Sequence, residues 1–265
     1  MIKNFRILLI ISLIAAGCST VPMTGRKQLN LVSNEDILTS SFHQYDEYIR
    51  TAPISKDMKK TEMVIKVGKR IAAAVEQYMK NNGMDDQIKT YRWEFHLVAD
   101  KTPNAFCMPG GKIVVYEGIL PYTQDETGLA VVLGHEVAHA VAKHSNERMS
   151  QQMVVALGGE VVNVAVSKKS DLVKQLAPTI YGLSSQYAVM LPYSRSHESE
   201  ADHMGLIFMA MAGYDPAKAE GFWLRMSQTG SKTPEFLSTH PSDQTRAAKI
   251  RSWLPEAQKY YKPVF

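Results

Sequence analysis

Cysteine is scarce in this sequence, no hydrophobic run is long, and neither sign of charge is in large excess. Its 265 residues include two cysteines, and 30 basic side chains stand against 26 acidic ones. There is no zinc-finger spacing, no glycine-rich phosphate loop and no basic block, so we expect no nucleic-acid partner. Hydrophobic residues make up 45% of the chain, which is typical of a globular protein with a full core.

The most apolar stretch lies near the N-terminus, at residues 7–16, and follows Lys3 and Arg6. About 20 apolar residues are needed to cross a bilayer, so this run is too short and predicts an export signal over residues 1–17. Small residues followed by Cys18 resemble the lipidation motif of bacterial lipoproteins, although Ala15 stands where leucine is more common. We therefore expect Cys18 to carry lipid and to hold the chain on a membrane. An ordinary cleaved signal peptide is the alternative.

If Cys18 carries lipid, Cys107 is the remaining thiol, and no disulfide can form within the chain. Cys107 is then expected to be a small buried apolar residue. Residues 18–32 are polar and contain Pro22 and Gly25, which predicts a lipidated N-terminus and a short tether. The remaining residues, 33–265, are predicted to form one domain.

Hydrophobic periodicity predicts mostly helices in this domain. Ser33 is the expected N-cap of the first helix. Helices are predicted at about 33–50, 57–80, 124–144, 183–212, 216–228 and 243–253, and strands at 91–99 and 112–116. The expected fold class is therefore α+β, mainly helical with a small antiparallel sheet. The apolar but interrupted segment 151–166 is either a packed helix or a movable cover.

A histidine–glutamate–x–x–histidine motif lies in the helix predicted around residues 127–141. An α-helix turns about 100° per residue, so His135 and His139 lie about 40° apart on one face. Two imidazoles one turn apart can bind one tetrahedral Zn²⁺, and Glu136 can then act on a water at the metal as general base. The motif alone is only moderately specific, so a third protein ligand has to be found elsewhere.

Two segments compete for the third ligand. One zinc class would place glycine at 142 and histidine at 145, but Ala142 and Ser145 occupy those positions, and His144 is expected at the surface. The other candidate is Glu198, with Asp202 one turn later to accept a hydrogen bond from a zinc-binding histidine. Glu200 points about 200° away from Glu198, and the flanking histidines at 197 and 203 are not expected to bind the metal. A solvated acidic helix face is the alternative.

The segment 104–111 lies directly before the second predicted strand. Pro109, Gly110 and Gly111 interrupt regular structure and favour the edge of the sheet. An open edge beside a catalytic helix can pair with an extended substrate backbone, whereas an ordinary hairpin edge would do nothing of the kind. The candidate substrate-binding residues are Asn104, Ala105, Phe106, Gly110 and Gly111.

The motif at 135–139 followed by Glu198 and Asp202 resembles the gluzincin metalloendopeptidases of the CAAX-prenyl-protease and HtpX type. The segments 104–111, 194–205 and 238–246 support the resemblance, which covers essentially all of the chain after Cys18. The sequence from Thr24 to Leu31 resembles the bacterial periplasmic lipoprotein branch. The resemblance implies a zincin-like fold and one Zn²⁺ per chain, held by His135, His139 and Glu198.

The resemblance also implies roles for residues that spacing alone does not assign. His240 would lie near the metal, where it either donates to the oxyanion or occupies the open metal position at rest, although His-Pro can be purely structural. Arg246 would face the substrate cleft or form a structural salt bridge. The implied function is cleavage of misfolded or stalled envelope proteins on the periplasmic face of an outer membrane. Ser19 after Cys18 also favours the outer membrane, by resemblance to lipoproteins of bacteria with two membranes. The alternative is a chaperone-like binding factor with little proteolysis.

Overall fold

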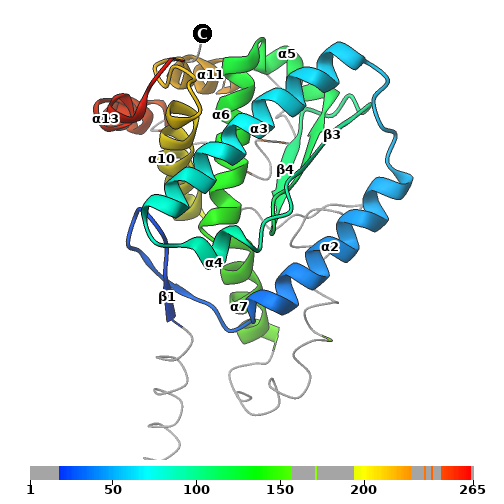
Figure 1. Ribbon diagram of the computed structural model, residues 1–265, viewed down its shortest axis with the longest axis vertical. Coiled ribbons are helices and arrows are strands. Elements are labelled where there is room, and N and C mark those ends of the chain that lie inside the picture. Colours follow the sequence, from blue (N-terminus) through cyan, green and yellow to red (C-terminus); the bar gives the residue numbers. More distant parts are fainter. Residues whose placement is uncertain are drawn as a thin grey trace, which may run out of the picture.

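The computed structural model describes residues 18–156, 194–227 and 246–263, together with 171, 236 and 240. Figure 1 shows helices arranged around a small sheet, with α6 in the middle and α10 beside it. The elements are β1 (Cys18–Thr20), β2 (Lys27–Leu29), α2 (Asn34–Thr51), α3 (Met58–Asn81), α4 (Asp85–Ile88), β3 (Glu94–Val98), β4 (Ala105–Met108), β5 (Lys112–Tyr116), η1 (Glu117–Ile119), α5 (Leu120–Thr123), α6 (Glu126–Val141), α7 (His144–Ala156), α10 (Arg195–Met211), α11 (Lys218–Ser227), α13 (Arg246–Ala257) and η2 (Gln258–Tyr260). The mainly helical α+β class is as predicted. None of these helices combines the length and the apolar character that a bilayer crossing requires.

The three-stranded sheet has the order β3-β5-β4 and is mixed, whereas an antiparallel sheet was expected. β5 pairs in parallel with β3 and antiparallel with β4. Gly110 and Gly111 both have positive φ, of 84° and 85°, which suits the tight turn of a hairpin. The residues before this turn therefore form a strand of their own, β4, and β3 is left to join β5 from the other side.

The sheet separates two hydrophobic cores, because successive side chains of a strand point to opposite faces. Ile113 and Val115 of β5 pack in the larger core with α3, α6 and α10. Val114 and Phe106 pack in a smaller core with α2 and α7. Cys107 faces the larger core as a buried free thiol, as expected from the sequence.

The predicted starts of the first two helices are confirmed. The Ser33 hydroxyl accepts a hydrogen bond from the backbone N–H of Asp36, and Asp57 caps α3 in the same way. The predicted helix at 124–144 is wrong at its end, because α6 stops at Val141 and Lys143 has a φ of 57°. This left-handed residue breaks the helix, so α7 leaves in a new direction and His144 is its first residue.

α6 and α10 cross in very close contact at two glycines. A Cβ added to Gly205 would lie 2.8 Å from the backbone carbon of Gly134, which is closer than real Cβ contacts. Only glycine allows this approach. It brings the helix with His135 and His139 against the helix with Glu198 and Asp202.

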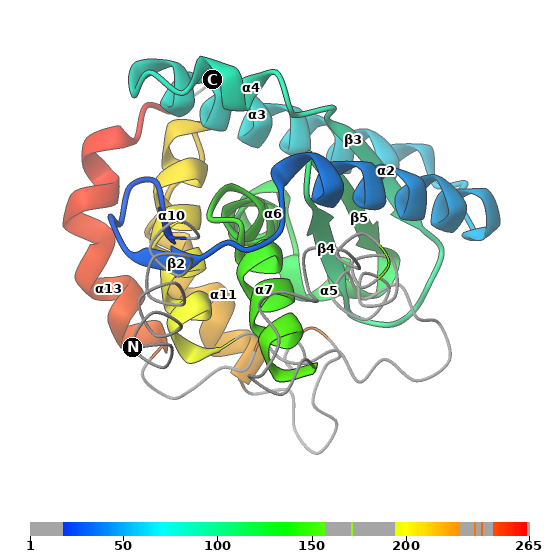
Figure 2. The same cartoon turned by 90° about the horizontal axis from the view of Figure 1, so that it is seen from below.

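Residues 18–32 were expected to be a tether, but the structure shows a packed segment. β1 and β2 form an antiparallel hairpin, and Val21 is buried in the larger core. Figure 2 shows this hairpin in front of α10, at the end of the domain where α7 begins. The polar composition misled the prediction, because the polar side chains of the hairpin bind partners on the domain.

Several predictions fall outside the described residues. These are the signal segment 1–17, most of the possible cover at 151–166, and the part of the predicted helix 183–212 that precedes residue 194.

Candidate metal centre

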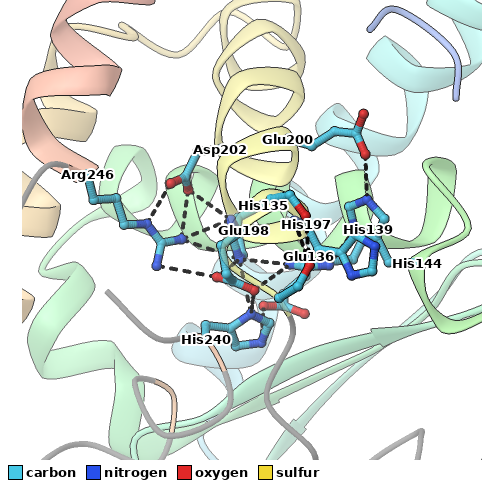
Figure 3. A network of polar contacts seen from close by, with 12 residues as sticks. His135, Glu136, His139, His144, His197, Glu198, Glu200, Asp202, His240 and Arg246 are labelled. Atoms are coloured by element: carbon cyan, nitrogen blue, oxygen red, sulfur yellow. Dashed lines mark hydrogen bonds and ion pairs between the residues drawn. The ribbon is translucent and has the colours of Figure 1, made fainter. Parts of the chain in front are cut away.

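Four side chains that are far apart in the sequence meet between α6 and α10. His135 and His139 come from α6, Glu198 comes from α10, and His240 comes from the chain before α13. All four are buried, and their potential ligand atoms lie within 4.8 Å of one another. Figure 3 shows the four side chains pointing toward one common region.

The distances between these atoms match a tetrahedral zinc site. Nε2 of His135 lies 3.1 Å from Nε2 of His139 and 3.1 Å from Nδ1 of His240. Oε1 of Glu198 lies 3.3 Å from Nε2 of His139 and 3.0 Å from Nδ1 of His240. Zinc binds such atoms at about 2.0 Å, so two ligands of a tetrahedral site lie about 3.3 Å apart. The donor set and its spacing therefore fit one Zn²⁺.

Two carboxylate oxygens at the centre also fit a bound cation. Glu198 Oε2 and Glu136 Oε1 are buried and accept no hydrogen bond from the described residues, although both have ion-pair contacts at 3.3–3.4 Å. A buried carboxylate oxygen without a hydrogen bond is costly, and a metal ion or a water on that ion would satisfy it.

Glu136 lies beside the cluster. Its Oε1 lies 3.3 Å from Nε2 of His240. Burial raises the pKa of Glu136, although His240, His135 and the backbone N–H of Cys107 act against it. A carboxylate whose pKa is raised toward neutrality accepts protons more readily than an ordinary glutamate, which suits general-base catalysis.

The carboxylate of Asp202 holds His135, as predicted from the spacing of Glu198 and Asp202. Asp202 Oδ1 lies 3.0 Å from Nδ1 of His135. Arg246 in turn donates to both oxygens of Asp202, at 2.6 and 2.7 Å, and its guanidinium stacks 3.4 Å above the ring of Trp223. Arg246 therefore forms a buried ion pair behind the metal ligands. Of the two roles expected for it, this is the structural salt bridge and not a position along the substrate cleft.

This environment makes His135 basic. Burial lowers the pKa of His135, but the charge of Glu198 and the hydrogen bond to Asp202 outweigh that effect and raise it to about 9. A carboxylate behind a metal-binding histidine fixes the ring and increases its basicity as a ligand.

His139 is held in a different way, by His144. Nδ1 of His139 lies 2.8 Å from Nδ1 of His144, and Nε2 of His144 lies 2.8 Å from Glu200 Oε2. The prediction of a surface position for His144 is wrong, because this side chain is fully buried. Burial lowers the pKa of His144 to about 4, so the ring is neutral and can accept at one nitrogen while donating at the other.

The break in the helix explains why the sequence did not identify His144. On one continuous helix His144 would point about 140° away from His139. The turn at Lys143 brings the two rings together instead, with centroids 4.8 Å apart. Apart from the histidine itself, no local sequence pattern predicts this contact.

Two further residues behind His144 were also missed. Glu200 points away from the metal, as predicted, but it binds His144 and Arg26 and is not a solvated surface group. Arg26 from the N-terminal hairpin also binds Glu147 of α7, which in turn contacts His197. Figure 3 places the Asp202–Arg246 pair on one side of the cluster and the His144–Glu200 pair on the other.

His240 occupies the fourth corner of the cluster. Besides its contacts with Glu198 and His135, its ring stacks on Phe236, with centroids 4.8 Å apart. The backbone N–H of His240 donates to the carbonyl of Phe236, and the N–H of Phe236 donates to the carbonyl of Pro103, just before β4. The segment that carries His240 is thereby tied to the start of the edge strand.

The structure places the candidate substrate-binding residues in two different environments. Ala105 begins β4 and Asn104 directly precedes it, and this strand forms an edge of the sheet and packs against α6. Phe106 turns its side chain into the smaller core, and Gly110 and Gly111 form the turn against Phe42 and Trp93. The backbone of β4 therefore lies next to the centre, whereas these last three residues serve the fold.

Comparison with known proteins supports what the geometry indicates. The family model for peptidase family M48 matches residues 66–254. The chain belongs to this family. The predicted resemblance is confirmed, and this M48 chain is a metalloendopeptidase whose cofactor is zinc.

Among the relatives of this M48 peptidase, mitochondrial proteins are more similar than bacterial ones. Mitochondrial metalloendopeptidase OMA1 of Schizosaccharomyces pombe is 39% identical over 90% of this chain and 67% of that protein. OMA1 of Saccharomyces cerevisiae is 30% identical over 95% of the chain and 76% of that protein. A putative beta-barrel assembly-enhancing protease of Vibrio cholerae is 27% identical over 83% of the chain and 44% of that protein. The chain thus resembles the bacterial branch less than it resembles OMA1.

Proposed function

We propose that this metallopeptidase is a lipid-anchored endopeptidase on the periplasmic face of an outer membrane, where it cleaves misfolded or stalled envelope proteins. The observation that carries the catalytic part is the buried cluster of four ligand atoms with Glu136 beside it. The cellular part rests on the segment that ends in Cys18, and on bacterial relatives whose name is beta-barrel assembly-enhancing protease. The mitochondrial relatives speak for proteolysis rather than for this location.

In this proposal His135, His139 and Glu198 hold the zinc, one ion per chain. Bound zinc supplies a water with a pKa of about 7 and polarises the substrate carbonyl. Asp202 and His144 keep the two imidazoles turned so that each Nε2 faces the ion.

Glu136 moves the proton. Its carboxylate takes a proton from the attacking water and passes it to the leaving amine, which is the usual task of a glutamate at this position of the motif. Its backbone contact with Cys107 places it beside β4, where an extended substrate can add as a further strand. Substrates in this proposal are unfolded segments, because a folded protein offers no free extended backbone.

His240 holds the centre closed at rest. Its Nδ1 lies 3.1 Å from His135 Nε2 and 3.0 Å from Glu198 Oε1, where it would occupy the ligand position that a catalytic water needs, and both His240 and Glu136 are buried. Displacement of His240 by substrate would open that corner and leave its imidazole near the developing oxyanion.

The decisive experiment measures zinc content and hydrolysis of unfolded casein by the purified protein and three variants. Glu136→Gln is expected to keep zinc and to lose at least about a hundredfold of the hydrolysis rate, because the base is gone. Glu198→Ala is expected to lose both zinc and hydrolysis. Glu62→Gln, an exposed glutamate of α3, is the matched control and should behave like the parent protein.

Two results would overturn the proposal. Hydrolysis that persists in Glu136→Gln would show that another group or a contaminant does the chemistry. Stoichiometric zinc with no cleavage of any unfolded protein, and unchanged binding of such proteins by Glu136→Gln, would favour the chaperone-like binding factor.

A further inference from the structure

The N-terminal hairpin makes its strongest contacts directly behind the proposed metal site. β2 contacts α7, and the backbone N–H of Leu31 donates to the Ser150 hydroxyl at 2.9 Å. Figure 2 shows the hairpin lying over α10 close to the start of α7. Both helices carry residues that stand behind His139.

Arg26 joins these two helices through one guanidinium. Its Nε donates to Glu200 of α10 at 2.8 Å, and its two terminal nitrogens donate to the two oxygens of Glu147 of α7 at 2.7 and 3.1 Å. Only arginine presents a planar fork that can bind one carboxylate with two bonds and a second with its Nε. Lysine would keep the charge and lose this bridge.

Glu200 is the carboxylate on which the hairpin and the site meet. It accepts hydrogen bonds from Arg26 and Thr24 of the hairpin and from Nε2 of His144. The hairpin therefore supplies two of the three donors that fix the orientation of this carboxylate.

The hydrogen bonds between the hairpin and His139 can run in one consistent direction. If His139 presents Nε2 to the metal, its Nδ1–H donates to Nδ1 of His144. His144 then carries its proton on Nε2 and donates it to Glu200. This sequence of donors fixes the rotation and the tautomer of His139 from behind.

We propose that the hairpin at residues 18–29 is a positioning element of the metal centre, acting on His139 through Arg26, Glu200 and His144. The inference rests on the proposed zinc site. It assigns to the hairpin a role in metal binding, and it makes Arg26 and His144 positioning residues that do not touch the metal or the substrate. A change at the hairpin therefore changes the affinity for zinc.

The test is a zinc titration against a competing chelator, with the full chain. Arg26→Gln is expected to weaken zinc binding about fivefold and His144→Phe about tenfold, the range found for groups that support metal ligands from behind. Arg26→Lys should resemble Arg26→Gln, because the charge remains and the bridge is lost. Lys27→Gln is the matched control: Lys27 lies in the same hairpin, but its ammonium group donates to Thr20 and not to Glu147 or Glu200.

Two further measurements separate positioning from simple loss of stability. In the cobalt-substituted protein, the visible absorption bands report ligand geometry, and they should shift in Arg26→Gln and in His144→Phe but not in Lys27→Gln. The double variant that combines Arg26→Gln with His144→Phe should lose little more zinc affinity than His144→Phe alone, because both changes interrupt the same series of contacts from Arg26 to His139.

Unchanged zinc affinity and an unchanged cobalt spectrum in Arg26→Gln would overturn the inference, even if the variant melts at a lower temperature. Full additivity in the double variant would also overturn it, because it would place the two residues on separate paths. If the parent protein binds no zinc at all, the proposed function fails first, and that outcome is distinct from a variant without effect.

Discussion

His135 and His139 lie one turn apart on α6, yet the structure supports them in opposite ways. Behind His135 stands the carboxylate of Asp202, held by Arg246, which itself is buried against Trp223. Behind His139 stands the neutral ring of His144, held by Glu200 and by an arginine from the other end of the chain. The pKa of His135 is raised to about 9, whereas burial lowers that of His139 well below its usual value, although Glu198 opposes this.

The difference shows two ways to hold a ligand. The His135 side is built within the core, from α10 and α13, and its charges have little access to water. The His139 side ends in a partly exposed guanidinium on the hairpin that begins at Cys18. The first side is expected to be rigid and costly to disturb, and the second is expected to respond to events at the N-terminus.

The largest expected effect comes from removing the two arginines in turn. Arg246→Ala leaves Asp202 and Glu198 as buried carboxylates without their counter-charge, which should cost about 3–5 kcal/mol of unfolding free energy. Arg26→Ala should cost about 1 kcal/mol, because Arg26 is partly exposed and water can take the place of its guanidinium beside Glu147 and Glu200. Urea unfolding at one fixed zinc concentration measures both. Equal losses of unfolding free energy in the two variants would contradict the expectation that the His135 side is the costlier one to disturb.

The next effect concerns the helix crossing on which both sides depend. Gly205→Ala forces a Cβ into the backbone of α6 and should destabilise the protein by about 2 kcal/mol. Gly221→Ala is the matched control, because its nearest atom is a flexible side chain 3.6 Å away. Gly221 lies at a partly exposed position of α11, where alanine should stabilise by about 0.5–1 kcal/mol. Thermal unfolding of both variants checks the prediction, which fails if the two shifts have the same sign.

A smaller change tests the carboxylate side alone. Asp202→Asn keeps the shape of the side chain and removes its charge, so His135 loses basicity, and zinc affinity should fall about tenfold. A chelator competition measures the affinity, with Asp86→Asn in the exposed helix α4 as control. An affinity equal to that of the parent protein would mean that the arginine alone orients His135.

The smallest expected effect is the pH dependence that the hairpin side contributes. Burial opposes ionisation of Glu147 and Glu200, but their hydrogen bonds to histidine and arginine outweigh it and lower both pKa values from 4.5 to about 2. Such groups stabilise the fold above their unfolded pKa, and this contribution is lost as the pH falls from about 4.5 to about 2. Urea unfolding across this window should show a shallower loss in Glu200→Gln than in the parent protein. Identical slopes would show that Glu200 contributes nothing.

Much of the site was accessible from local patterns. The spacing in residues 135–139 placed two histidines on one helix face, and the spacing of Glu198 and Asp202 placed a metal ligand and its neighbour on another. The N-caps at Ser33 and Asp57 were equally local, because a cap involves only residues within one turn. Periodicity also predicted two of the three strands of the sheet.

The predictions that failed concern breaks and long-range contacts. One left-handed residue, Lys143, turned a supposed surface histidine into the partner of His139. The polar composition of residues 18–32 predicts a tether, but Arg26 in this segment binds carboxylates that lie 121 and 174 positions later in the sequence. Neither feature leaves a periodic pattern in the sequence.

By itself, the sequence determined most of the long helices, the cap at Ser33 and the identity of the zinc-binding motif, because each depends on residues a few positions apart. The tertiary structure decided which group stands behind each histidine, that His240 completes the cluster from 105 positions beyond His135, and that β3 pairs in parallel with β5. These features depend on how closely α6 and α10 approach at Gly134 and Gly205 and on where the chain reverses. Backbone contacts across such distances arise only when the whole domain packs.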